Sequence, residues 1–182
     1  QSRGALQLDE ETFARVIGAH PLAGSHESGF GASRANLFEG CTVSIESRAP
    51  TEVRERMQWM WTLVGAAQLE YRAAGEHDVM MAWVSHLPQL AATALASTFA
   101  AQHIDPQSIG PGARDSTRLA ASSFDQWSAL LGAEPAVLGA ALRGLESNLA
   151  RIRSALASDD HRELKTMWES AQRWRRAAER RA

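Results

Sequence analysis

The residues best suited to chemistry lie close together in one stretch near the start of the chain, His20-Pro21-Leu22-Ala23-Gly24-Ser25-His26. The apolar run Val16 to Ala19 before it predicts a buried strand, and the glycines after it predict a loop. An imidazole at a strand end accepts a hydrogen bond or a proton near neutral pH, and open α/β sheets bind ligands at such ends. A structural alternative is that His20 only caps the strand and the glycines make turns.

Two arginines form a second candidate site. Arg114 and Arg118 are four residues apart, so we expect them on one face of a helix. The preceding Gly110-Pro111-Gly112 predicts a loop that leaves the start of this helix accessible. Two guanidiniums beside free backbone N–H groups make an anion site suited to carboxylate or phosphate. The alternative is a surface ion pair of Arg114 with Asp115 or Glu134.

The third candidate feature is a proline inside a long apolar helix. The sequence predicts this helix from Glu76 to about Gln102, apolar on nearly all sides and therefore buried. Pro88 removes a backbone hydrogen bond and therefore predicts a kink in this helix. The kink would change the direction of the Ser85 and His86 side chains in the turn before the proline.

The elements that must position these groups fall into two regions. Residues 1–48 carry a short helical turn, the strand that ends at His20 and a second strand, and they look like the last part of a sheet domain whose first part is absent. Residues 49–182 are predicted to be helical, so the fold class is mainly α. The expected elements are a helical turn near Asp9, strands at Thr42–Ile45 and Gln68–Tyr71, helices at Pro50–Val64, 76–102, 114–122, 124–131 and 135–157, and a last helix capped by Asp159.

Composition narrows the function classes. The 182 residues carry a net charge of -2, which gives no basic field for nucleic acid. The single cysteine, Cys41, excludes an intrachain disulfide and a cysteine-based metal cluster and fits a reducing compartment. Every apolar run is interrupted before the roughly 20 residues that a membrane span needs. We expect a soluble, cytoplasmic protein with no membrane contact and no metal, and the first residue, Gln1, suggests a piece of a longer chain.

Five blocks of residues follow one another along nearly the whole chain. They are His20-Pro21-Leu22-Ala23-Gly24-Ser25-x-x-Ser28-Gly29, Asn36-Leu37-Phe38-Glu39-Gly40, Glu76-His77-Asp78, Ser85-His86-Leu87-Pro88 and Arg114-Asp115-x-Thr117-Arg118-x-Ala120-x-Ser122 with Trp127. Their ordered set resembles the prephenate and arogenate dehydrogenases of tyrosine biosynthesis.

This resemblance implies an oxidative decarboxylation of prephenate or arogenate that depends on NAD or NADP. Hydride leaves the ring carbon that bears the hydroxyl, and loss of carbon dioxide makes the ring aromatic. His20 would polarise the hydroxyl, which requires a neutral imidazole near pH 7. Arg118 would hold a substrate carboxylate as a fork.

The same resemblance implies further roles. Ser85 and His86 would line the pocket, and Ser25 would face substrate or cofactor. The helical region would form an intertwined homodimer in which the cluster around Arg114 comes from the neighbouring subunit. The implied substrate-binding residues are Ser25, His26, Ser85, His86, Gln89, Arg114, Arg118 and Trp127, with Pro21 and Gly24 beside the cofactor.

The chain departs from the family pattern at several positions. His26 stands where many members have an acidic or other residue, Gln89 where many have a second histidine, and Pro111 where many have glycine. His26 and Gln89 leave open the choice between prephenate and arogenate and the possibility of feedback by tyrosine. The alternative is drift at positions on the rim of the site.

The nucleotide fingerprint Gly-x-Gly-x-x-Gly is absent from the sequence, because Gly29-x-Gly31 lacks the third glycine and the strand-to-helix context. We therefore expect the C-terminal part of such an enzyme, inactive alone and without tight NAD binding. One alternative is a stand-alone, non-catalytic dimerisation and ligand-binding module. Another is a related dehydrogenase that acts on an amino-substituted prephenate.

Overall fold

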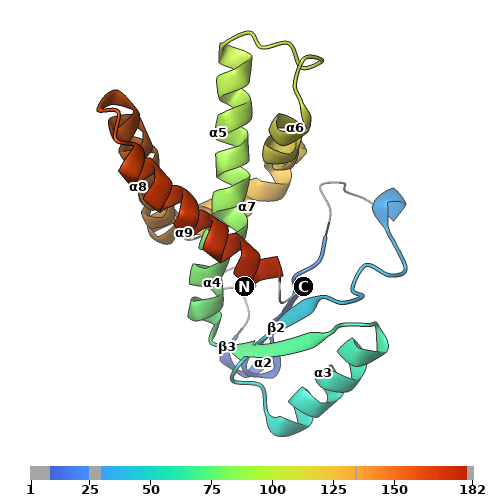
Figure 1. The fold of residues 1–182 in the computed structure, drawn as a ribbon. Helices are drawn as coiled ribbons and strands as arrows, with labels where there is room; N and C mark the ends of the chain where they lie inside the picture. Colours follow the sequence, from blue (N-terminus) through green and yellow to red (C-terminus); the bar gives the residue numbers. More distant parts are fainter. Residues whose placement is uncertain (1–8, 25–29, 134, 180–182) are drawn as a thin grey trace. The chain divides into compact units, whose positions relative to one another are not determined.

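The computed structural model describes residues 9–24, 30–133 and 135–179 (Figure 1). The chain is mainly helical with one small sheet, as the sequence predicts. It divides into two compact units, residues 1–137 and 138–182. The domain boundary between residues 48 and 49 stays a prediction. Two short helical elements lie before the central strand of the sheet. They are α2 (Glu10–Arg15), with Asp9 as its N-cap, and the 3-10 turn η1 (Phe30–Ala32).

The sheet has three strands in the order β1-β2-β3, namely β1 (Ala19–Pro21), β2 (Thr42–Glu46) and β3 (Gln68–Arg72). The central β2 pairs antiparallel with β1 and parallel with β3. The second and third strands lie where the sequence predicts them.

The predicted first strand is wrong in its position. Backbone pairing with β2 reaches back only to Gly18, whose carbonyl accepts from the N–H of Glu46 over 3.0 Å, and side chains bind other backbone groups of this segment. Arg48 donates to the carbonyl of Val16, and Gly18 N–H donates to the carboxylate of Glu46 over 3.3 Å. The strand begins only at Ala19, so His20 lies within β1 rather than after it.

The core of the sheet forms around β2. Val43 and Ile45 are 0% and 1% exposed, and burying two such branched side chains contributes about 1.5–3 kcal/mol each. The helix α3 (Thr51–Leu63) covers this strand with one stripe of residues at helical spacing, Val53, Met57 and Trp61. Ser44, on the opposite face of the strand, is 4% exposed, so β2 is buried on both faces.

A long helix carries the predicted kink in a different form. It consists of α4 (Ala74–Met81), a π-helical turn η2 (Ala82–His86) and α5 (Leu87–Ala101). Leu87 N–H bonds to the carbonyl of Ala82, five residues back. Pro88 follows at once and has no N–H to continue the regular ladder, so the turn before it widens.

The predicted burial of this helix is wrong for the described chain. The side chains that are buried along it are few, Met81, Ala82, Gln89 and Ala92, whereas Val79, Trp83, Val84 and Leu95 are exposed.

The same helix, Ala74–Ala101, is long and apolar enough to span a membrane by length and composition. Its most apolar window has a mean hydropathy of 1.2 and is 22% buried. By this measure, the expectation that every apolar run is too short to span a membrane is wrong. Isolated polar residues barely lower the mean hydropathy of an alanine-rich helix. Core helices of soluble proteins pass the same test.

The helix predicted around the two arginines begins earlier and ends sooner than expected. α6 runs from Pro111 to Thr117, with the proline in its first turn. A 3-10 turn, η3 (Arg118–Ala121), replaces its last predicted turn, and α7 (Phe124–Ala133) follows. Gly112 therefore lies in the helix rather than in a loop, and Arg114 and Arg118 do not share one continuous α-helical face.

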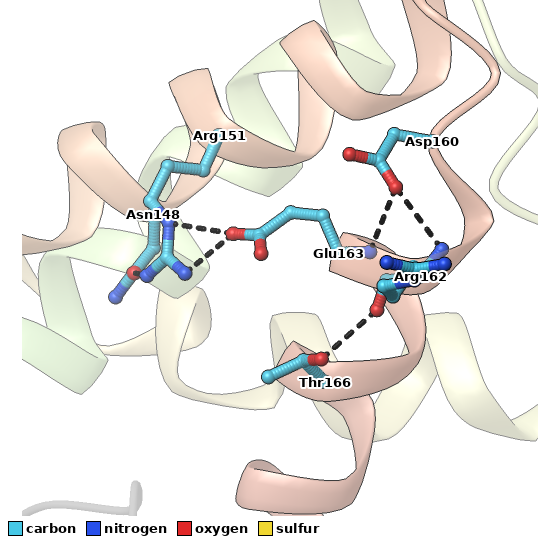
Figure 2. Close-up of polar contacts among 6 residues, drawn as sticks. All are labelled: Asn148, Arg151, Asp160, Arg162, Glu163 and Thr166. Atoms are coloured by element: carbon cyan, nitrogen blue, oxygen red, sulfur yellow. Dashed lines mark hydrogen bonds and ion pairs between the residues drawn. The ribbon is translucent and has the colours of Figure 1, made fainter.

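The second unit is a helical hairpin made from the end of α8 (Pro135–Ala157) and α9 (His161–Glu179). Figure 2 shows that Asp160 caps α9, since its Oδ1 accepts the N–H groups of Arg162 and Glu163 at 3.1 and 3.0 Å. The predicted cap, Asp159, is wrong by one residue, because its φ of 55° places it in the turn. Arg151 of α8 donates to Glu163 of α9 at 2.5 Å.

Replacing Gly65 after α3 tests how the sheet is joined to its covering helix. Gly65 has a φ of +90°, and a Cβ there would lie 3.3 Å from the Cα of Glu39. We expect Gly65→Ala to lower the free energy of unfolding by about 1–3 kcal/mol, because alanine is strained at positive φ. Urea denaturation measures this. Gly132→Ala in α7, where a Cβ meets nothing within 4 Å, is the control, and equal losses for both variants would contradict the explanation.

Candidate active site

A row of hydrogen-bonded side chains joins the sheet to the long helix. Nδ1 of His20 lies 2.9 Å from Nε2 of His77, and the two rings meet edge to face with centroids 5.1 Å apart. Nδ1 of His77 in turn lies 3.0 Å from Oδ1 of Asp78. The row links His20, the predicted catalytic residue, to two residues that the sequence analysis placed in a motif without giving them a role.

The sheet register fixes both ends of this row. His20 in β1 is paired with Ser44 of β2, and Ser44 is 4% exposed. β3 is parallel to β2 and ends at Arg72, and α4 begins at Ala74. His77 therefore lies in the first turn of α4, close to the sheet that carries His20.

The electrostatic surroundings favour a neutral His20. Partial burial of the ring lowers the pKa of His20 below its ordinary value of 6.5, and the neighbouring His77 and His86 lower it further. Burial also lowers the pKa of His86, against the opposing effect of Asp78. Because burial and two neighbouring imidazoles all lower this pKa, His20 is neutral at pH 7 and offers a lone pair.

The structure also brings two other predicted site residues together. His86 in the π-helical turn contacts Trp127 of α7, with ring centroids 5.7 Å apart and planes at 88°. Ser85, which precedes His86 in the same turn, is half-buried. An aromatic wall beside a histidine suits a planar or cyclic ligand.

Gln89 is a buried residue rather than a rim residue. It is 5% exposed, and its Nε2 donates to the carbonyl of Leu119 over 2.9 Å. Its Oε1 has no hydrogen-bond partner among the described residues. The explanation by drift at the rim is therefore wrong for Gln89, which ties α5 to the turn that begins at Arg118.

The two arginines remain apart from the histidines. Arg114 and Arg118 are both exposed, and in the described ranges neither guanidinium forms an ion pair, so the structure shows no bridge from Arg114 to Asp115. Glu134 lies outside the described residues. Among the described residues, no hydrogen bond joins Arg118 to His20.

The other residues of the predicted site lie near the end of β1 or outside the residues that the structure describes. Pro21 is the last residue of β1. Gly24 lines an open cavity of about 320 Å³ together with Arg34, Asn36 and Glu39, and His20 is not among its lining residues. Ser25 and His26 lie outside the described residues.

Sequence reasoning missed the roles of His77 and Asp78. The signal that was available is a histidine next to an aspartate in the first turn of a predicted helix, in a chain that already offers a candidate catalytic histidine. What the sequence lacks is the information that this turn packs against β1.

Comparisons with known proteins identify the family of the chain. A family model described as "Prephenate dehydrogenase, dimerization domain" matches residues 73–170. The prephenate dehydrogenase of Lactococcus lactis subsp. cremoris is 28% identical over 179 residues, which are 96% of this chain and 49% of that protein. The chain therefore spans about half the length of this curated relative.

Solved structures show the same fold. The prephenate dehydrogenase of Aquifex aeolicus, solved in complex with hydroxyphenyl propionate and NAD+, matches with a TM-score of 0.78 at 27% identity and covers 89% of this chain and 58% of that one. The arogenate dehydrogenase of Synechocystis matches with a TM-score of 0.74 at 19% identity, covering 89% and 61%, and supports the fold alone. Since the dimerisation-domain model covers more than half of the chain, the chain belongs to the prephenate dehydrogenase family.

Proposed function

We propose that the protein is a prephenate or arogenate dehydrogenase of tyrosine biosynthesis and that this chain provides its substrate-binding and dimerisation parts. The observation that carries the proposal is His20, a neutral imidazole held by His77 in a chain of this family. The relatives support it, because the Lactococcus lactis protein and the Aquifex aeolicus structure are both named prephenate dehydrogenase.

The chain's own residues account for the handling of the substrate. His20 accepts a hydrogen bond from the ring hydroxyl and draws electron density toward the oxygen, which favours departure of hydride from the same carbon. Arg118, exposed at the start of η3, holds a carboxylate through its two-pronged guanidinium. The His86 and Trp127 rings form a wall for the substrate ring.

The cofactor of this reaction is NAD or NADP, as the NAD+ in the Aquifex aeolicus structure suggests, and when bound it accepts the hydride. The residues of this chain do not fit a dinucleotide by themselves. The glycine-rich turn that binds a pyrophosphate is absent from the sequence, and the cavity beside Gly24 is lined by one cation and one carboxylate, Arg34 and Glu39, so it has no net positive charge to hold a pyrophosphate. The chain therefore contributes the substrate side of the site.

We assign the exposed apolar surface of the long helix to the interface between the two subunits of a homodimer. Val79, Trp83, Val84 and Leu95 are between 36% and 58% exposed, and all lie within the segment matched by the dimerisation-domain model. Burial of such residues between two subunits gives the helix an apolar surrounding without a membrane, which is consistent with a cytoplasmic enzyme.

An assay of the intact protein tests the proposal. Reduction of NAD or NADP is followed by absorbance with prephenate, with arogenate and with an amino-substituted prephenate as separate substrates. Turnover of the first or second supports the proposal and identifies the side chain that the site accepts. Turnover of the third alone would make the protein a related dehydrogenase, and no turnover would favour the non-catalytic module.

His20 should set the acid limb of the pH profile. Because the pKa of His20 is lowered below 6.5, the ring stays neutral at pH 7, and we expect kcat/KM to fall only as the pH drops below that ordinary value and protonates the acceptor. His20→Asn should reduce kcat by about 10²- to 10⁴-fold and remove this limb. Steady-state kinetics across pH measures both, and unaltered turnover in His20→Asn would exclude the polarising role.

Arg118 should contribute to substrate affinity. We expect Arg118→Ala in the complete enzyme to raise KM on the order of tenfold or more, because a charge-assisted fork to a carboxylate is lost. Arg151→Ala, which removes an arginine of the helical hairpin that pairs with Glu163, is a matched control and should leave KM unchanged. An unchanged KM in Arg118→Ala would place Arg118 outside the substrate site.

The 182-residue chain alone should bind NAD weakly. We expect no binding in the micromolar range, because the backbone donors that hold a pyrophosphate at a glycine-rich turn are missing from its sequence. Isothermal calorimetry with NAD and with NADP measures this directly. Micromolar binding of either would show that the chain contains a nucleotide site of its own.

A further inference from the structure

The direction of the hydrogen bonds along the row of Asp78, His77 and His20 follows from its geometry when Asp78 is ionised and His77 is neutral. An ionised carboxylate only accepts hydrogen bonds, so the 3.0 Å contact with Asp78 places a proton on Nδ1 of His77. A neutral His77 then has a lone pair on Nε2. Since this Nε2 lies 2.9 Å from Nδ1 of His20, that nitrogen must be the donor. A neutral His20 is left with a bare Nε2.

We propose that His77 and Asp78 are positioning residues that hold His20 in its Nδ1-protonated tautomer and thereby make Nε2 the atom that accepts the substrate hydroxyl. The proposal rests on the proposed function for the identity of that hydroxyl. The tautomer is a property of the protein without substrate, so it is measured independently of activity.

The charges around the row explain why it favours this tautomer. The titratable groups that act on His20 from the long helix are His77 and His86, and Asp78 acts on His86 in turn. A proton added to His77 would make both of its ring nitrogens donors. Nδ1 of His20 would then have to accept, its proton would lie on Nε2, and the hydroxyl acceptor would be lost. Neutral imidazoles and an ionised Asp78 are therefore required together.

The low solvent exposure of its side chains distinguishes this row from an ordinary surface pair. The His77 and Asp78 side chains are 18% and 33% exposed. The hairpin contains a comparable contact, in which Nε2 of His161 lies 2.9 Å from Asp159, but those side chains are 82% and 87% exposed. Water competes for every polar atom of that pair, so it has no fixed tautomer to impose. It provides a matched control within the same molecule.

Histidine side-chain 15N NMR of the intact protein tests the tautomer. Six histidines are present, and the His20 signals are assigned by their loss in His20→Asn. We expect Nδ1 of His20 to be protonated and Nε2 to be bare in the unmodified protein at neutral pH. A proton on Nε2 would overturn the proposal, and this measurement requires no substitution of His77 or Asp78.

Asp78→Asn should weaken or reverse the row, because its amide offers an N–H to Nδ1 of His77. We expect the His20 signals to shift toward the Nε2-protonated form and kcat to fall on the order of 10- to 100-fold with little change in KM. This is less than the about 10⁴-fold loss when an aspartate directly beside a catalytic histidine is replaced, because here the carboxylate acts through a second imidazole. Unchanged His20 signals and unchanged kcat would overturn the proposal.

Substitutions of His77 separate positioning from packing. His77→Gln keeps an oxygen that accepts the His20 proton, whereas His77→Leu keeps bulk alone, so the glutamine variant should retain more of kcat and of the Nδ1-protonated form. His161→Asn should change neither. Equal kcat in the glutamine and leucine variants would indicate a packing role only. If the intact protein turns over neither prephenate nor arogenate, the proposed function fails, while the NMR result still decides the tautomer.

Discussion

The burial of β2 on both faces is the constraint on which the rest of the first unit depends. A strand whose side chains are 0% and 1% exposed at Val43 and Ile45 cannot shift by one residue without moving these groups to the opposite face. Its register therefore determines where β1 and β3 lie. Through β1 it places His20, and through the short connection after β3 it places the first turn of α4. A catalytic hydrogen bond thus depends on packing in a core that touches no ligand.

The long helix is largely apolar, yet it carries several of the polar residues of the candidate site. The π-helical turn before Pro88 carries Ser85 and His86, and the buried amide of Gln89 follows one turn later and reaches Leu119. The helix thereby connects the histidine row at one end to the arginine turn at the other. Each contact is modest in energy, about 0.5–1.5 kcal/mol for a neutral hydrogen bond, but together they fix the spacing of groups that a substrate must meet at once.

Much of the fold was predictable from periodicity. The spacing of Val53, Met57 and Trp61 predicts α3, and Pro135 predicts the start of α8, because these signals are local. The strand at β1 was misplaced because the side chains of Arg48 and Glu46, about thirty residues away, bind the carbonyl of Val16 and the N–H of Gly18. The histidine row was not predictable either, since it depends on how a helix packs on a sheet. The resemblance to a family located His20 and Arg118, whereas their surroundings had to come from the structure.

The widened turn at Ala82–His86 has a consequence for the phase of the helix. A π turn holds about one residue more than an α turn, and one residue corresponds to about 100° of rotation around the axis. The residues of α5 are therefore rotated relative to those of α4 by a step that a regular helix would lack. Loss of one residue from this turn would leave a sequence able to form an unbroken helix, but Gln89 would turn away from Leu119 and the arginine turn would lose its anchor. The length of this segment is thus under tighter constraint than its composition, and alignments of such chains should tolerate substitutions there more readily than gaps.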